Sequence, residues 1–195
     1  MPSPHIVLAS ASPRRQELLS VIFGNFRMVP SDFDESTVPA DLGPSEHAVY
    51  SALMKARDVA QRCPKSLVIG ADTIVVLEDK ILGKPADAHD AARMLQILSG
   101  RTHQVYTGLA LVRGEMERSD FECTRVSFRA LTNEMISRYV ATGEPLDKAG
   151  AYAIQGKGAV LIRSTSGCYP NVVGLPLYKL SALLEDFGIE VLVDQ

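Results

Sequence analysis

The sequence has few of the residues that mark metal or disulfide centres. Of its 195 residues, only three are cysteine and four are histidine. The cysteines, Cys63, Cys123 and Cys168, are odd in number and lack the spacing of metal ligands, so we expect reduced thiols and a cytoplasmic protein. The four scattered histidines argue against a zinc site.

Features of membrane and nucleic-acid-binding proteins are also absent. No apolar run reaches the length of a membrane span, and residues 1–5 are too short and too polar for a signal peptide. The formal net charge of −3 argues against a nucleic-acid partner, but it leaves room for a small anion in a local basic pocket. The sequence contains neither a P-loop pattern nor a Rossmann fingerprint.

Strand-type and helix-type segments alternate along the chain, without a long linker or an internal repeat. The predicted strands cover residues 5–10, 26–30, 67–71, 73–77, 151–154 and 158–163, and residues 103–112 and 121–128 form a hairpin. The predicted helices cover residues 13–23, 44–62, 87–99, 132–143 and 177–187. We therefore predict an α/β fold with a mixed twisted sheet flanked by helices and a long central hairpin, in one domain over residues 1–195 with room for two lobes around a cleft.

The opening of the chain indicates an anion site. An apolar strand leads into Ser10 and Ser12, and Ser12 followed by Pro13 is typical of a helix N-terminus. Arg14 and Arg15 then fall in the first helical turn, where cations are normally disfavoured by the helix dipole. A bound phosphate would outweigh that repulsion. A capped surface helix with solvated arginines explains the same spacing about equally well.

A second candidate is Asp72, which we expect at the end of the buried strand 67–71. The carboxyl ends of strands are where α/β proteins place ligands, so this carboxylate suits a general base or a metal ligand. On local sequence alone, an aspartate that caps a turn is the more common case.

Charged residues elsewhere give weaker signals. The carboxylates of residues 32–35, Glu35 among them, suit a hard divalent cation, although a solvated acidic loop is the usual explanation. Lys55 lies within a predicted helix, and Lys84 lies in a Gly-Lys-Pro corner whose backbone Pro85 holds extended. In the glycine-punctuated segment 147–156, Gln155 could face a ligand, or the glycines could simply form turns.

Together these segments resemble the Maf (septum-formation) family of nucleoside triphosphate pyrophosphatases over nearly the whole chain. The motifs that carry the resemblance are LASASPRR (8–15), DE (34–35), KA (55–56), GADT (70–73), GKP (83–85), LSG (98–100), YV (139–140), GEP (143–145), DKAGAY (147–152), IQG (154–156) and VGLP (173–176). Their number and order make the signal specific. The resemblance implies a fold of the Maf and inosine-triphosphatase type and, as an expectation, a homodimer.

The resemblance also implies the activity, hydrolysis of a nucleoside triphosphate to the monophosphate and pyrophosphate. In the family, Arg14, Thr73 and Gln155 occupy the positions that separate subgroups, and here they follow the dTTP/UTP pattern. A glutamine amide accepts from N3–H of uracil or thymine and donates to O4, whereas an ionised glutamate only accepts.

For the remaining residues, the resemblance implies roles in binding phosphate and activating water. Phosphate oxygens would be bound by Arg14, Arg15, Lys55 and Lys84, with Ser10 beside them in the substrate site. A divalent cation, Mg²⁺ or Mn²⁺, would be held by Glu35 and Asp72, and Asp72 would be the general base.

Two other functions fit the same residues. A related pyrophosphatase could act mainly on modified nucleotides and so cleanse the nucleotide pool. A nucleotide-binding regulator of cell division, in which catalysis is incidental, is the alternative from a different class. An α/β domain whose motifs are merely structural is disfavoured by the number of matched segments.

Overall fold

The structure is a computed structural model that describes residues 5–191. Its chain divides into two compact units. Unit 1 comprises Met1–Asp72, Thr107–Glu122 and Gly174–Gln195, and unit 2 comprises Thr73–Tyr106 and Cys123–Val173. Each unit has a hydrophobic core of its own.

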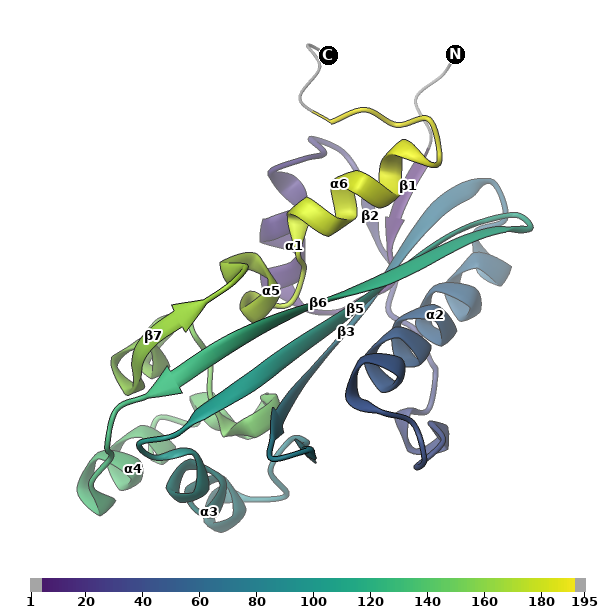
Figure 1. Ribbon diagram of the computed structural model, residues 1–195. Coiled ribbons are helices and arrows are strands. Elements are labelled where there is room, and N and C mark those ends of the chain that lie inside the picture. Colours follow the sequence, from purple (N-terminus) through teal and green to yellow (C-terminus); the bar gives the residue numbers. More distant parts are fainter. Residues whose placement is uncertain (1–4, 192–195) are drawn as a thin grey trace. The chain divides into compact units, whose positions relative to one another are not determined.

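Within the described residues, seven strands form a mixed sheet in the order β2-β1-β3-β5-β6-β7, with β4 beside β3. The strands are β1 (His5–Leu8), β2 (Arg27–Met28), β3 (Ser66–Leu77), β4 (Lys80–Leu82), β5 (Thr102–Arg113), β6 (Met116–Phe128) and β7 (Ile162–Ser166). β1 is parallel to both β2 and β3, whereas β4 is antiparallel to β3 and β7 is antiparallel to β6. β5 and β6 form a long hairpin (Figure 1). The predicted mixed α/β fold with a long central hairpin is therefore confirmed.

In unit 1, helices cover both faces of the strands. The helices are α1 (Pro13–Ser20), α2 (Pro44–Arg62) and α6 (Leu177–Glu185), and a short 3₁₀ helix spans Glu35–Thr37. Because side chains alternate along a strand, Val7 and Val68 pack with α2, whereas Leu8 and Ile69 pack with α1 and α6. Figure 1 shows α2 on one side of these strands and α6 on the other.

Helix α2 lies unusually close to the strands because glycines face it. A Cβ atom added at Gly70 would lie 2.2 Å from the carbonyl oxygen of Ala52, and one added at Gly108 would lie 2.1 Å from that of Ala48. Small residues on both sides thus let the helix backbone rest on the strand backbone, which fixes the height of α2 above β3.

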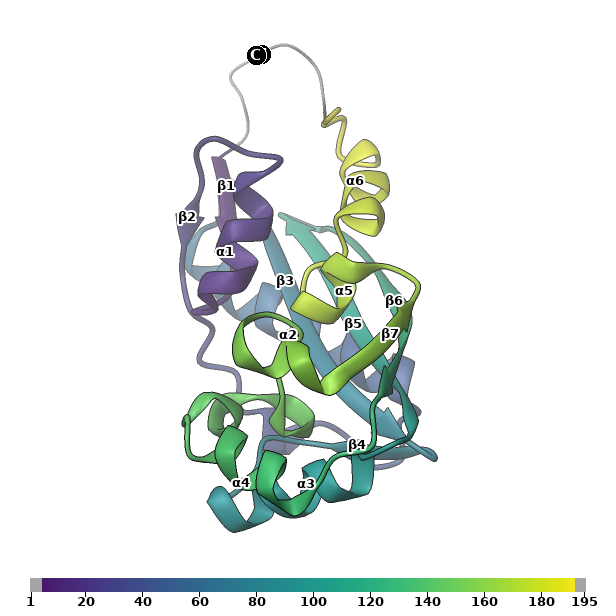
Figure 2. The same cartoon turned by 90° about the vertical axis from the view of Figure 1, so that its left-hand side faces the viewer.

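Unit 2 contains the halves of β5 and β6 that lie farther from the turn of the hairpin. Its helices are α3 (Ala88–Leu98), α4 (Asn133–Val140) and α5 (Tyr169–Val173), with 3₁₀ helices at Glu144–Asp147, Ala149–Ala151 and Gly156–Leu161. α3 and α4 lie side by side (Figures 1 and 2) and share one apolar core with the strands. Within that core, the rings of His103, Phe128 and Tyr152 pack edge to face, with centroids 4.8–5.3 Å apart.

The predicted strands at residues 151–154 and 158–163 are wrong. Most of this stretch folds into 3₁₀ turns and irregular chain, and the strand β7 begins only at Ile162. The glycines decide the outcome, because Gly150 and Gly156 have φ values of 67° and 71°, which interrupt an extended chain. The run 73–77, expected to continue the run 67–71, does so, and residues 66–77 form one continuous strand. Helix α5 was not predicted. No helix within residues 5–191 is both long and apolar enough to cross a membrane.

Candidate active site

The first turn of α1 is built as the sequence predicts. Ser12 is the N-cap, its hydroxyl accepts from the backbone N–H of Arg15 at 3.4 Å, and Pro13 takes the first helical position. The Ser10 hydroxyl accepts from the N–H of Ser12 at 3.1 Å. No acidic residue lies in this turn, so the positive end of the helix and the two arginines are not offset locally.

Arg15 is held in a fixed position. Its Nε donates to the carbonyl oxygen of Gly174 at 2.8 Å, and its Nη1 donates to the Ser10 hydroxyl at 3.4 Å. Loss of hydration on burial lowers the pKa of the Arg15 guanidinium; Asp72 opposes this shift and Arg14 adds to it. Arginine stays charged nonetheless, so the site keeps a partly buried cation that favours an anionic ligand.

Lys55 joins two carboxylates from distant parts of unit 1. Its Nζ lies 2.6 Å from Oε1 of Glu35 and 2.6 Å from Oδ1 of Asp72. The side chains of Lys55 and Asp72 are both only 12% exposed, whereas that of Glu35 is 53% exposed. The buried Lys55–Asp72 pair is therefore the fixed part of the group, and Glu35 lies at its solvent side.

The expected placement of Asp72 at a strand end is wrong, because Asp72 lies in the middle of β3. Its parallel neighbour β1 pairs with β3 only as far as Ile69, and β4 pairs with it only from Val75 onward. The β-branched residues after Asp72 extend the strand. Asp72 thus lies just beyond the carboxyl end of β1, the end from which the chain continues to Ser10 and α1.

The acidic loop is anchored by a residue that sequence reasoning missed, Asp58 on α2. Its Oδ2 accepts from the Ser31 hydroxyl and the Asp32 N–H, both at 2.9 Å, and from Arg62 at 2.8 Å. These bonds attach the loop that precedes Glu35 to the helix that carries Lys55. The only sequence signal was helical spacing, since Asp58 follows Lys55 by three residues on the same helix.

The remaining predicted residues, Thr73, Lys84 and Gln155, belong to unit 2. Lys84 is exposed, and its corner is fixed by a hydrogen bond from the N–H of Gly150 to the carbonyl oxygen of Gly83 at 3.0 Å. Gln155 is partly buried and directly precedes the 3₁₀ helix Gly156–Leu161. Thr73 follows Asp72 on β3. The structure therefore brings together Ser10, Arg15, Lys55, Glu35 and Asp72 in unit 1.

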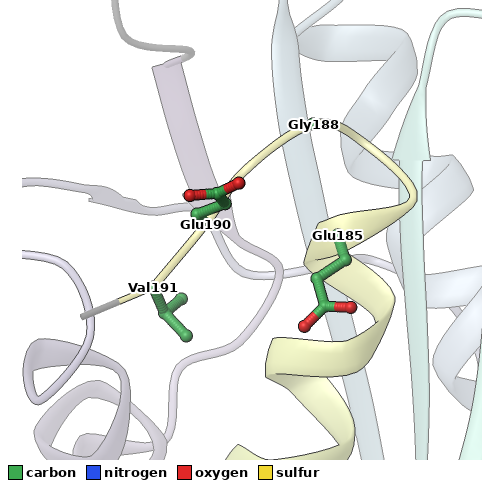
Figure 3. Close-up of a pocket in the computed structure, with 4 residues that line it drawn as sticks. All are labelled: Glu185, Gly188, Glu190 and Val191. Atoms are coloured by element: carbon green, nitrogen blue, oxygen red, sulfur yellow. The ribbon is translucent and has the colours of Figure 1, made fainter. Parts of the chain in front are cut away.

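A hollow of about 690 Å³ at the end of unit 1 is a poor candidate for the same chemistry. Glu185, Gly188, Glu190 and Val191 line it (Figure 3). Both charged side chains are exposed carboxylates, which repel a polyphosphate. The described residues of this acidic surface thus lack the cationic side chains that would bind a polyphosphate, which Arg15 and Lys55 supply elsewhere in unit 1.

The site supplies part of a donor set for a divalent cation. Within residues 5–191, no group of three or more histidine, cysteine or acidic side chains is arranged to hold a metal. Glu35 and Asp72 nevertheless supply two carboxylates that meet at one cation, the Lys55 ammonium. Mg²⁺ commonly binds one or two carboxylates and takes its other ligands from phosphates and water. The residues therefore fit a cation that binds together with a phosphorylated ligand.

The chain is similar to known proteins over nearly its whole length. Residues 5–187 match the family described as Maf-like protein. A dTTP/UTP pyrophosphatase from Clostridium botulinum (strain Kyoto / Type A2) is 50% identical over 96% of this chain and 99% of its own. One from Symbiobacterium thermophilum is 53% identical over 95% of each chain. The Staphylococcus aureus Ham1 protein has the same fold, with a TM-score of 0.53 at 18% identity over 94% of this chain and 99% of its own.

Proposed function

The chain belongs to the Maf family, and we propose that it hydrolyses nucleoside triphosphates, preferentially dTTP and UTP, to the monophosphate and pyrophosphate. The relatives named for this activity align with the chain over nearly their full length, and about half of the aligned residues are identical. The observation that carries the proposal is the buried ion pair of Lys55 and Asp72. The Asp72 carboxylate also interacts electrostatically with the Arg15 guanidinium, so the three charged side chains form one cluster.

The assigned roles follow from the charges of these groups. The triphosphate is polyanionic, so Arg14 and Arg15 bind its oxygens through their planar guanidinium groups, helped by backbone N–H groups at the start of α1. Ser10 orients Arg15 through its hydroxyl. Lys55 and Lys84 stabilise the negative charge that develops on the leaving pyrophosphate.

Asp72 is assigned as the general base. Lys55 holds its Oδ1, which orients the carboxylate and leaves Oδ2 to accept a proton from the attacking water. Water then attacks the α-phosphorus, and the bond to the bridging oxygen breaks. The products are the nucleoside monophosphate and pyrophosphate.

Glu35 and Asp72 are the residues that would hold Mg²⁺ or Mn²⁺. When bound, such a cation supplies charge neutralisation on the phosphates and makes water more acidic. The chain's own contribution is the placement of Glu35, through the loop that Asp58 fixes to α2.

Base selection is assigned to Gln155, with Arg14 and Thr73 at the other two positions that separate the subgroups. The Gln155 amide offers one acceptor and two donors, which complement N3–H and O4 of uracil and thymine. A pyrophosphatase for modified nucleotides remains the second candidate, since it would use the same phosphate chemistry. We also propose a homodimer as the working form, which light scattering tests directly.

A hydrolysis screen tests the function. Purified protein is incubated with canonical and modified nucleoside triphosphates, with and without Mg²⁺, and pyrophosphate is separated from orthophosphate. We expect pyrophosphate, fastest from dTTP and UTP and dependent on the cation. Orthophosphate alone would mean attack at the terminal phosphate and would refute the proposal, and faster turnover of modified nucleotides would favour the second candidate.

A further inference from the structure

The carboxylate of Glu144 lies inside a turn of backbone that directly follows Gln155. Its Oε2 accepts from the N–H of Lys157 at 3.0 Å, and its Oε1 accepts from the N–H of Gly158 at 2.9 Å. Gly156 begins this turn with φ of 71°. Successive backbone N–H groups thus converge on one anion, as they do in anion-binding nests, but here the anion is a side chain of the same unit.

Tyr139 extends this contact to the other side of Gln155. Its hydroxyl donates to Oε1 of Glu144 at 2.9 Å and accepts from the N–H of Ala153 at 3.2 Å. Tyr139 is 5% exposed, on α4. Glu144 and Tyr139 therefore hold the backbone two residues before Gln155 and two and three residues after it.

The chain around Gln155 has little freedom to move in other ways. The four residues before it, 151–154, are all buried. On the other side, a Cβ atom at Gly156 would lie 2.7 Å from Oε2 of Glu144, so the turn closes directly against the carboxylate. Burial by itself would raise the pKa of Glu144, but the N–H groups of Lys157 and Gly158 and the Tyr139 hydroxyl outweigh it and lower that pKa. The anion is the form that the turn binds.

From this arrangement we infer that Glu144 and Tyr139 are positioning residues for base selection. They hold the Gln155 amide in the position from which it forms hydrogen bonds with the pyrimidine. The inference rests on the proposed function, in which Gln155 recognises the base. Glu144 itself touches neither base nor phosphate in this role. Its effect reaches the substrate through the backbone of residues 153–158.

This role requires a carboxylate, because both of its oxygens accept hydrogen bonds. Three donors converge on its two oxygens. A glutamine of the same shape has one oxygen, and its NH₂ group would face a backbone N–H donor. Glu144→Gln therefore leaves at least one of these three donors without its acceptor and releases the turn, while the charge-independent packing stays the same.

The test compares Glu144→Gln with Glu134→Gln, a control on the neighbouring helix whose carboxylate forms an exposed pair with Arg138. The readout is the ratio of kcat/KM for UTP to kcat/KM for CTP, together with NMR hydrogen exchange of the Lys157 and Gly158 amides. We expect Glu144→Gln to lower the ratio at least tenfold and to speed exchange at both amides at least tenfold. The control changes neither.

A double-mutant comparison separates positioning from general damage. In a Gln155→Ala background, Glu144→Gln should leave the ratio unchanged, because no amide remains to be positioned. A ratio that stays constant in the Glu144→Gln single variant, or that falls equally in both backgrounds, overturns the inference. If Glu144→Gln does not fold, Tyr139→Phe replaces it, with an expected threefold loss of the ratio and refutation if the ratio is unchanged.

An inactive wild-type protein would refute the proposed function instead. The same ratio is then taken from the dissociation constants of UTP and CTP, and the same outcomes decide the inference. The two failures are thus distinguishable.

Discussion

The Nζ atom of Lys55 lies 2.6 Å from Oδ1 of Asp72, so one ion pair joins the interior of α2 to the middle of β3. Both side chains are largely buried, and breaking a buried pair leaves an uncompensated charge. The pair therefore links the position of the proposed base to the packing of the helix on the sheet.

Asp72→Asn is expected to abolish measurable turnover while nucleotide binding persists. The asparagine keeps the shape and the contact with Lys55 but cannot take a proton, and loss of a general base costs at least about 10²-fold in rate. Pyrophosphate release and calorimetric binding of UTP are the two measurements. Asp79→Asn, in the exposed turn between β3 and β4, is the control. Near-normal hydrolysis by Asp72→Asn would exclude Asp72 as the base.

Arg14→Ala and Lys84→Ala are expected to lower kcat/KM by about tenfold each, since each removes one charge-assisted contact among several. The matched control is Lys65→Ala, which removes an exposed lysine next to β3. Steady-state kinetics with dTTP measure the effect. A loss at either position as large as that of Asp72→Asn would contradict the division of roles proposed above.

Gln155→Glu is expected to weaken dTTP and UTP turnover relative to CTP. An ionised glutamate accepts hydrogen bonds only, which suits the amino group of cytosine and not O4 of uracil. Competition between UTP and CTP in one reaction gives the ratio directly, and Gln104→Glu, on β5, serves as the control. Unchanged relative rates would remove the base-reading role from Gln155.

Gly70→Ala is expected to lower the free energy of unfolding by at least about 2 kcal/mol, because the new Cβ overlaps the α2 backbone and the core must shift. Nothing lies within 4 Å of a Cβ at Gly24, so Gly24→Ala should stay within about 0.5 kcal/mol. Urea denaturation measures both. The Gly70 variant should also lose activity, since α2 carries Lys55.

Stability is expected to fall as the pH is lowered from about 6.5 to 4 because of His103. This side chain is 1% exposed, its Nε2 lies 2.7 Å from the Tyr152 hydroxyl, and burial lowers its pKa to about 4. Below pH 6.5 this histidine binds a proton in the unfolded chain but stays neutral in the folded chain. The free energy of unfolding therefore falls by up to about 3 kcal/mol by pH 4. Above pH 6.5 both states are neutral at this residue and the effect vanishes.

The comparison between wild type and His103→Gln isolates this contribution, because other acidic groups titrate in the same range. Urea denaturation at pH 8 and at pH 5 gives the two differences. The gap between the variants should depend on pH, and a gap of equal size at both values would contradict the assignment.

Much of the fold was predictable because its signals are local. The Ser12–Pro13 cap, the hairpin of β5 and β6 and the helix α2 follow from capping and periodicity. The strands expected before residue 162 are absent, because the β-forming side chains of this stretch are overruled by glycines at positive φ and by the Glu144 carboxylate. That carboxylate lies several residues away along the chain.

The candidate site was predictable in its residue types but not in its contacts. Arg15, Lys55 and Asp72 were identified from motifs, whereas the placement of Asp72 within a strand depends on where β1 stops pairing. The anchoring by Asp58 depends on a loop that returns to α2. Both depend on tertiary contacts, which the spacing of residues along the chain does not reveal.

The close seating of α2 on Gly70 and Gly108 sets limits on redesign. Engineers who wish to alter nucleotide preference have no room for larger side chains beneath that helix, so the part of unit 1 to which we assign phosphate binding tolerates little change. The turn that encloses Glu144 is held by side-chain contacts instead. New substrate ranges are better sought there, by exchanging the acceptor and the residues that wrap around it as a set.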